Sequence, residues 1–86
     1  MKAYNFENSS IDLACEEVGK FLAQSGVERR EALRMRLTLE ETLLAYQERL
    51  TQAAEFKIRT AKRFSSVRIE AIIAGESFDP FLARGG

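Results

Sequence analysis

Two adjacent glutamates, Glu40 and Glu41, are the residues whose type could most directly support acid–base chemistry in this chain. A carboxylate can serve as a general base, but without a bound metal, a nucleotide or a histidine it has nothing to activate. The chain contains no histidine, the side chain used most often as a general base and as a metal ligand. We therefore expect the pair to lie at the polar edge of a helix, where Glu41 can pair with Arg36 or with Arg49.

The single cysteine, Cys15, cannot form an internal disulfide or a thiolate metal site, which points to a reducing compartment. It lies in an apolar stretch with Ala14 and Val18, so we expect a small core residue rather than a reactive thiol. Tyr46 is likewise expected to be a core or interface aromatic rather than a catalytic phenol. These residues predict that the chain is not an enzyme, has no catalytic residue and binds no metal or other cofactor.

Basic side chains gather toward the C-terminal half, at Lys57, Arg59, Lys62, Arg63 and Arg68. Such a strip could bind a phosphate backbone, but no aromatic platform is interleaved with it. The 13 basic and 13 acidic residues of the chain also cancel, so no overall field attracts nucleic acid. We expect a solvated outer sheet face whose charges have cross-strand partners such as Glu70, and no nucleic-acid partner.

The chain has 86 residues, 45% of them hydrophobic and 30% charged, which is ordinary for a globular domain. Few chains of this size contain more than one domain, so we expect a single domain over residues 1–86. No apolar stretch approaches the roughly 20 residues of a membrane span, and the first ten residues, MKAYNFENSS, lack the apolar run of a signal peptide. These features predict a cytoplasmic segment that does not itself insert into a membrane.

Two helices are predicted from apolar residues at helical spacing. Helix one covers about residues 10–25, with Asn8, Ser9 and Ser10 as candidate N-caps and Gly26 as a stop signal. Helix two covers about residues 28–52, which lack glycine and proline. Its apolar residues form two neighbouring stripes, Leu33, Leu37 and Leu44 in one and Met35, Leu39, Leu43, Tyr46 and Leu50 in the other. Together the stripes predict a wide apolar face that packs on both a sheet and helix one.

The hydrophobic period then changes to two, which predicts an antiparallel hairpin over about residues 55–74 with a polar link at 62–66. Residues 2–7 could form a short edge strand. A lone hairpin is barely stable, so the helices must cover one of its faces. The expected fold is an α+β two-layer sandwich in the order β-α-α-β-β, with two helices on a small antiparallel sheet. Residues 75–86 are expected to form a turn-rich tail in which Phe78 and Phe81 cap the core or serve in docking.

Two strings within this order resemble motifs of the GHKL (Bergerat-fold) ATPase domain of anti-sigma-factor serine kinases and histidine kinases. Residues 37–45, LTLEETLLA, are similar to the family's L-x-L-E-E-A-L-x-N, whose glutamate can act as a base and whose asparagine holds magnesium. Residues 73–80, IAGESFDP, are similar to the end of its D-x-G-x-G-F-D-P box, whose aspartate reads adenine. The resemblance implies that Glu41, Gly75 and Asp79 are relics of an ATP site.

The departures from the family pattern fall where the chemistry would be. The magnesium-binding asparagine corresponds to Ala45, which offers the hard cation no oxygen. The adenine-reading aspartate corresponds to Ile73, which cannot accept a hydrogen bond. The chain also ends before the family's ATP lid and last strands. The resemblance therefore implies the N-terminal half of a GHKL domain, truncated and degenerate, with its usual activity lost.

We therefore expect a non-catalytic regulatory or protein-interaction module, a cytosolic piece of a larger sensor or transporter protein. Its partner is expected to be another protein or a second copy, as in a homodimer. The candidate interface residues are Tyr46, Ile69, Phe78 and Phe81. One alternative is an ATP-binding regulator that uses magnesium, with Glu41 and Gly75 in the pocket. A second alternative is a nucleic-acid-binding module that uses the basic hairpin.

Overall fold

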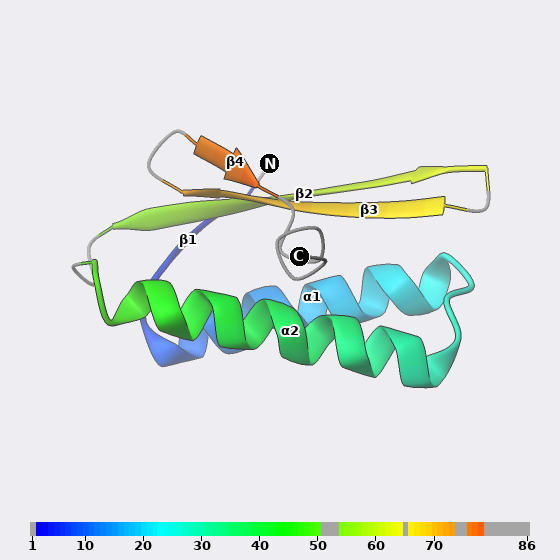
Figure 1. The fold of residues 1–86 in the computed structure, drawn as a ribbon, viewed down its shortest axis with the longest axis horizontal. Coiled ribbons are helices and arrows are strands. Elements are labelled where there is room, and N and C mark those ends of the chain that lie inside the picture. Colours follow the sequence, from blue (N-terminus) through cyan, green and yellow to red (C-terminus); the bar gives the residue numbers. More distant parts are fainter. Residues whose placement is uncertain (1, 51–53, 65, 74–75, 79–86) are drawn as a thin grey trace, which may run out of the picture.

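The protein is described here by a computed structural model that covers residues 2–50, 54–64, 66–73 and 76–78. Its elements in chain order are β1 (Ala3–Asn5), α1 (Asn8–Gln24), α2 (Arg29–Gln47), β2 (Glu55–Arg63), β3 (Ser66–Ile73) and β4 (Glu76–Phe78). Two antiparallel helices lie side by side against one face of the sheet, as Figure 1 shows. The predicted α+β class and the order β-α-α-β-β are confirmed. The structure adds the short strand β4, where the sequence predicted turns.

The sheet has the strand order β1-β2-β3-β4, and every neighbouring pair is antiparallel. The hairpin strands β2 and β3 pair from Phe56 opposite Ile73 to Arg63 opposite Ser66. The strands therefore run further than predicted, and the link is two residues instead of the expected 62–66. Phe64, the first of these two, has a φ of 55° and a side chain that is 90% exposed. Such tight hairpin links require positive φ angles.

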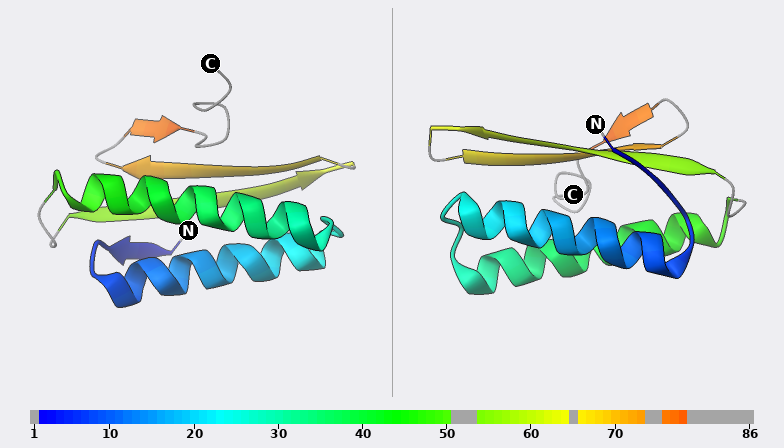
Figure 2. Two further views of the ribbon diagram at one scale, coloured as in Figure 1. Left: turned by 60° about the horizontal axis from the view of Figure 1, so that its bottom comes forward. Right: turned by 180° about the vertical axis from the view of Figure 1, so that it is seen from behind.

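The predicted two-residue alternation divides the sheet into an inner and an outer face. Ile69, Ala71 and Ile73 of β3 are buried, whereas Arg68 between them is exposed. In β2, Phe56 is fully buried and its neighbour Lys57 is exposed. The two other views in Figure 2 agree that both helices lie on the inner face.

Helix α1 begins at Asn8, earlier than predicted, and none of the three predicted caps is its N-cap. The N-cap is Glu7, which has extended backbone angles and makes no side-chain cap bond. The side chain of Asn5 accepts a hydrogen bond from the Glu7 amide at 3.0 Å, a local turn that leads the chain from β1 into the helix. The predicted stop at Gly26 is confirmed, because this residue follows the helix with a φ of 83°, which glycine tolerates.

Helix α2 ends at Gln47, five residues before the predicted end at residue 52. The Gln47 amide nitrogen donates hydrogen bonds to the Phe6 carbonyl at 2.7 Å and to the Asn8 side-chain oxygen at 2.8 Å. These bonds fasten the end of α2 to the junction of β1 and α1. The chain must then leave the helix layer to begin β2 at Glu55. The helix therefore ends at Gln47, where the chain turns toward the sheet, although its residue types favoured a helix as far as residue 52.

The core lies mainly between α1 and the sheet. Five residues of α1 are buried in it, whereas α2 contributes only Leu39 and Leu43 among its buried hydrophobic residues. The remaining fully buried large side chains include Phe6, Phe56 and Ile69. Phe56 stacks on Tyr4 with ring centroids 5.3 Å apart and also contacts Phe6 at 4.9 Å. Because only a narrow strip of the surface of α2 is buried in the core, most of its surface faces away from the sheet.

Candidate functional site

The two glutamates of the pair have different surroundings on α2. Glu41 is exposed on α2, and within the described residues it makes no ion pair with either Arg36 or Arg49. Glu40 is half-buried at a shallow hollow between the two helices, which Asp12 also lines. In the described part of the chain, no group of histidine, cysteine, aspartate or glutamate side chains could hold a metal ion. The pair therefore belongs to no described group of metal-ligating side chains, and the chain has no histidine that could act with it.

The two positions at which the sequence departs from the motifs that it resembles carry apolar side chains. Ala45 is exposed on α2, one turn beyond Glu41, and its methyl group offers no oxygen. Ile73 is only 5% exposed and belongs to the core opposite Phe56. Two further candidates, Gly75 and Asp79, lie outside the described residues.

Cys15 is fully buried in α1, as expected for a core residue. Burial raises the pKa of its thiol to about 11, so the thiol is protonated near neutral pH and is a poor nucleophile. Tyr46 is half-buried and packs against the core.

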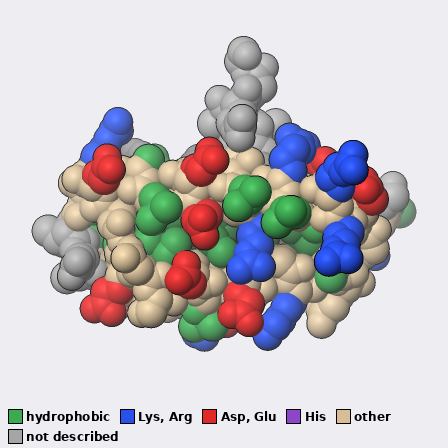
Figure 3. Space-filling view, turned by 90° about the horizontal axis from the view of Figure 1, so that it is seen from below, with side chains coloured by type: hydrophobic (Ala, Val, Ile, Leu, Met, Phe, Trp, Pro, Cys, Tyr) green, Lys and Arg blue, Asp and Glu red, His purple; other side chains and the backbone are tan. Residues whose placement is uncertain are grey.

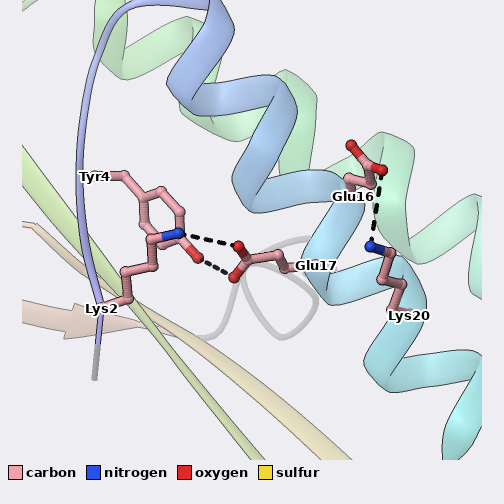
Figure 4. A network of polar contacts seen from close by, with 5 residues as sticks. All are labelled: Lys2, Tyr4, Glu16, Glu17 and Lys20. Atoms are coloured by element: carbon pink, nitrogen blue, oxygen red, sulfur yellow. Dashed lines mark hydrogen bonds and ion pairs between the residues drawn. The ribbon is translucent and has the colours of Figure 1, made fainter.

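A polar network that the sequence did not predict joins β1 to α1, as Figure 4 shows. The Glu17 carboxylate accepts hydrogen bonds from the Tyr4 hydroxyl at 2.5 Å and from the Lys2 ammonium at 3.2 Å. Burial, together with the adjacent carboxylate, raises the pKa of Tyr4 to about 12. The hydrogen bonds from Tyr4 and Lys2 hold the pKa of Glu17 below its usual value. Both shifts move the pKa values of these groups further from neutral pH. The network therefore fits a structural link better than acid–base catalysis.

The basic hairpin has the cross-strand partner that the sequence predicted. On the outer face, the Glu70 carboxylate lies 3.0 Å from Arg68 and 3.7 Å from Arg59. Its side chain is 14% exposed, whereas those of the two arginines are more than half exposed. One carboxylate thus interrupts the basic strip at the point where β2 and β3 carry their arginines side by side.

The four predicted interface residues are described only in part. Ile69 is fully buried in the core, so its side chain does not lie at the surface of the single chain. It belongs to β3, whose residues Ala71–Ile73 pair with β4, and it packs in the core cluster. Phe78 belongs to β4, for which only the backbone pairing is described, and Phe81 lies outside the described residues.

The structure instead exposes a leucine stripe on α2, defined here as Leu33, Leu37 and Leu44. These side chains are 57%, 49% and 39% exposed. Their spacing of four and seven residues places them on one side of the helix, and Glu40 lies between them on the same side. The sequence predicted that this stripe would pack on the sheet and helix one. That prediction is wrong because Leu39 and Leu43 of the neighbouring stripe already complete the core contact.

The leucine stripe borders a groove between α1 and α2 that widens into two hollows. The larger, about 650 Å³, lies near the interhelix loop and is lined by Leu33, Val27 and Ala32 together with the basic Lys20, Arg29 and Arg36. Glu16, on the same rim, forms an ion pair with Lys20 at 3.9 Å. The smaller, about 270 Å³, lies at the other end and is lined by Leu44, Ile11, Asn8, Asp12 and Glu40.

Charge is therefore separated along the helix face. Figure 3 shows this face, with most of the Lys and Arg side chains toward one end, most of the Asp and Glu side chains toward the other and hydrophobic groups between them. Apolar groups with a charged rim are the usual composition of a protein-binding surface.

Comparison of the chain with protein-family models, with curated proteins and with solved structures finds no match. No helix in the described part of the chain is long and apolar enough to cross a membrane.

Proposed function

We propose that this chain is a non-catalytic protein-interaction module whose contact surface is the leucine stripe of α2 and the groove beside it. The observation that carries the proposal is the exposure of Leu33, Leu37 and Leu44 on one side of a helix whose opposite side is packed in the core. Single exposed leucines are common, but an aligned set beside an apolar hollow is typical of a binding surface. Burying the set against a partner would remove the three apolar side chains from water.

We further propose that the module is a degenerate relative of the N-terminal half of a GHKL domain and a regulatory part of a larger sensor or transporter protein. The similarity of residues 37–45 and 73–80 to the family motifs supports this relationship. Ala45 and Ile73 weigh against retained ATP binding, because neither can bind magnesium or read adenine. The fold would then have been retained for protein binding at its surface and not for ATP hydrolysis.

Site-specific photo-crosslinking in cells tests the contact surface. A photoreactive amino acid replaces Leu37 in the stripe or, as the matched control, Leu13, an exposed leucine of α1 that lines neither hollow. We expect protein adducts from position 37 that disappear when Leu33→Gln and Leu44→Gln are added, and no such adducts from position 13. Equal adduct patterns at the two positions, or none at position 37, would contradict the proposal.

Titration with ATP and ADP, with and without magnesium, tests the competing nucleotide-binding function. A ligand present at about 100 times its dissociation constant should stabilise the fold by about 2.7 kcal/mol, which thermal unfolding detects readily in a small domain. We expect no shift in the unfolding temperature. A shift that requires magnesium would overturn the argument from Ala45 and Ile73 and favour a nucleotide-dependent regulator.

A further inference from the structure

We infer that the partner of the leucine stripe is a second copy of this chain, bound so that the two α2 helices run antiparallel across a two-fold axis. This inference rests on the proposed function and names the partner of the same surface. The supporting observation is the distribution of charge along the stripe. One end is basic and the other is acidic, so a second copy that runs in the opposite direction presents opposite charges at both ends.

The two halves of α2 carry opposite charge. The first half contains Arg29, Arg30, Arg34 and Arg36, with Glu31 as its acidic residue. Glu31 pairs with Arg34, which leaves the other three arginines without an ion pair among the described residues. The second half contains Glu40 and Glu41, and Glu48 and Arg49 follow directly.

Helix α1, which runs antiparallel to α2, adds to the acidic end of this separation. Its Asp12 lines the smaller hollow with Glu40, whereas its Lys20 lines the larger hollow with Arg29 and Arg36 and is paired there with Glu16. The positive charge at the basic end therefore comes from the arginines of α2, and Figure 3 shows basic side chains gathered toward one end of this face and acidic side chains toward the other.

This polarity selects one of the two ways in which the face can pair with itself. A two-fold axis parallel to the helices would set the basic end on the basic end, which like-charge repulsion disfavours. A two-fold axis across the helices sets the basic end of each copy on the acidic end of the other. Such an isologous contact uses the same patch on both copies and closes at a dimer.

The spacing of the leucines fits the antiparallel arrangement. If Leu33 lies opposite Leu44 of the second copy, the same register brings Arg36 beside the second copy's Glu40 and Arg30 beside its Glu48. Symmetry repeats each contact and sets Leu37 of each copy opposite Glu40 of the other, so leucine pairs lie toward both ends of the contact and opposite charges lie beside them. Leu44 of each copy then faces the larger hollow of the other, whose wall is formed by Leu33, Val27 and Ala32.

The expected dimer is of moderate affinity and sensitive to salt. A helix of 19 residues is about 28 Å long, so the contact is at the lower end of the sizes found for specific interfaces. Its flanking ion pairs are exposed at the rim, where salt screens them. We expect half-dissociation at micromolar concentrations in low salt and about tenfold weaker association in molar salt.

Charge reversal tests the register by sedimentation equilibrium of the full chain. Arg36→Glu alone sets glutamate against Glu40, and Glu40→Arg alone sets arginine against Arg36, so each variant should dimerise at least tenfold more weakly than the natural chain. A one-to-one mixture should form a heterodimer, because position 36 of each chain then meets an opposite charge at position 40 of the other. Failure of the mixture to associate would overturn the antiparallel register.

Leu37→Glu provides a second test. It should abolish the dimer while the helical circular dichroism stays unchanged, because Leu37 is exposed in the single chain. Leu13→Glu, the matched control, should leave dimerisation intact. A natural chain that stays monomeric up to millimolar concentration would overturn the inference, and stripe-dependent photo-adducts to other proteins would then show that the proposed function survives. Absence of both dimer and adducts would overturn the two together.

Discussion

The hydroxyl of Tyr4 donates a hydrogen bond to the Glu17 carboxylate at 2.5 Å and thereby joins strand β1 to helix α1. The ring of Tyr4 is also stacked on Phe56 of β2, so the residue links an edge strand, the central hairpin and the helix layer. The strand β1 is only three residues long, and its pairing with β2 alone would hold it weakly. This contact therefore explains how so short a strand becomes a fixed part of the sheet.

The variant Tyr4→Phe should lower the free energy of unfolding by about 1 kcal/mol near neutral pH, because it removes the hydrogen bond and keeps the stacked ring. The pKa of Tyr4 is raised from 10.0 to about 12 in the folded protein, so its contribution is complete below pH 10 and is lost as pH rises toward 12. The pKa of Glu17 is lowered from 4.5, so its contribution is present above that pH and is lost as pH falls through the lowered value.

The difference in stability between the natural chain and Tyr4→Phe should accordingly be largest between about pH 5 and pH 10 and shrink on both sides. Urea unfolding followed by circular dichroism across this range measures it. Glu17→Gln should remove the acid-side loss while the tyrosine ring stays in place. A pH-independent difference would mean that the hydrogen bond contributes nothing and that only packing had changed.

The variant Leu39→Ala should destabilise the fold by about 2–5 kcal/mol, since it removes a fully buried side chain from the core. Leu13→Ala removes the same atoms from a side chain that is 41% exposed, and should change stability by only about 0.5 kcal/mol. Chemical denaturation of both variants at low protein concentration provides the comparison. Similar losses for the two would contradict the assignment of Leu39 to the core.

The variant Gln47→Glu should cost about 1–3 kcal/mol at neutral pH, because a carboxylate cannot donate to the Phe6 carbonyl and the Asn8 oxygen. Below the pKa of the new carboxyl group, its O–H can donate one hydrogen bond, so part of the loss should be recovered on acidification relative to the natural chain.

Gln24→Glu, at the exposed end of α1, is the matched control for Gln47→Glu. It places the same charge at a helix C-terminus and should cost only about 0.5 kcal/mol through the helix dipole. If both variants lose equal stability at neutral pH, the loss comes from the helix dipole and not from the two donor bonds of Gln47.

The basic strip of the hairpin should bind a single-stranded oligonucleotide weakly and with modest salt dependence, because Glu70 pairs with both Arg59 and Arg68 and offsets one of their two positive charges. Fluorescence anisotropy at several salt concentrations measures this. Glu70→Gln should strengthen the binding and steepen its salt dependence, whereas Lys57→Ala, Arg59→Ala and Arg68→Ala together should abolish whatever binding remains. Tight, steeply salt-dependent binding by the natural chain would favour the nucleic-acid-binding function instead.

Local patterns in the sequence were sufficient to predict the two helices, the hairpin and the α+β class. The period of two through Ile69, Ala71 and Ile73 assigns them to one face of a strand, because successive side chains of a strand must alternate. The stop at Gly26 follows equally from the backbone freedom of glycine. Such features depend only on residues that are close together in the chain, so they can be predicted from the sequence alone.

Tertiary packing decided which apolar stripe of α2 reaches the core and which stays in water. Both stripes have helical spacing and similar residues, so no local rule separates Leu37 from Leu39, although one is 49% exposed and the other is fully buried. The choice depends on how α1 and the sheet share the sides of α2, which is a property of the assembled layers. For the same reason the surface proposed here for binding, and the Tyr4–Glu17 contact across 13 residues, followed only from the folded structure.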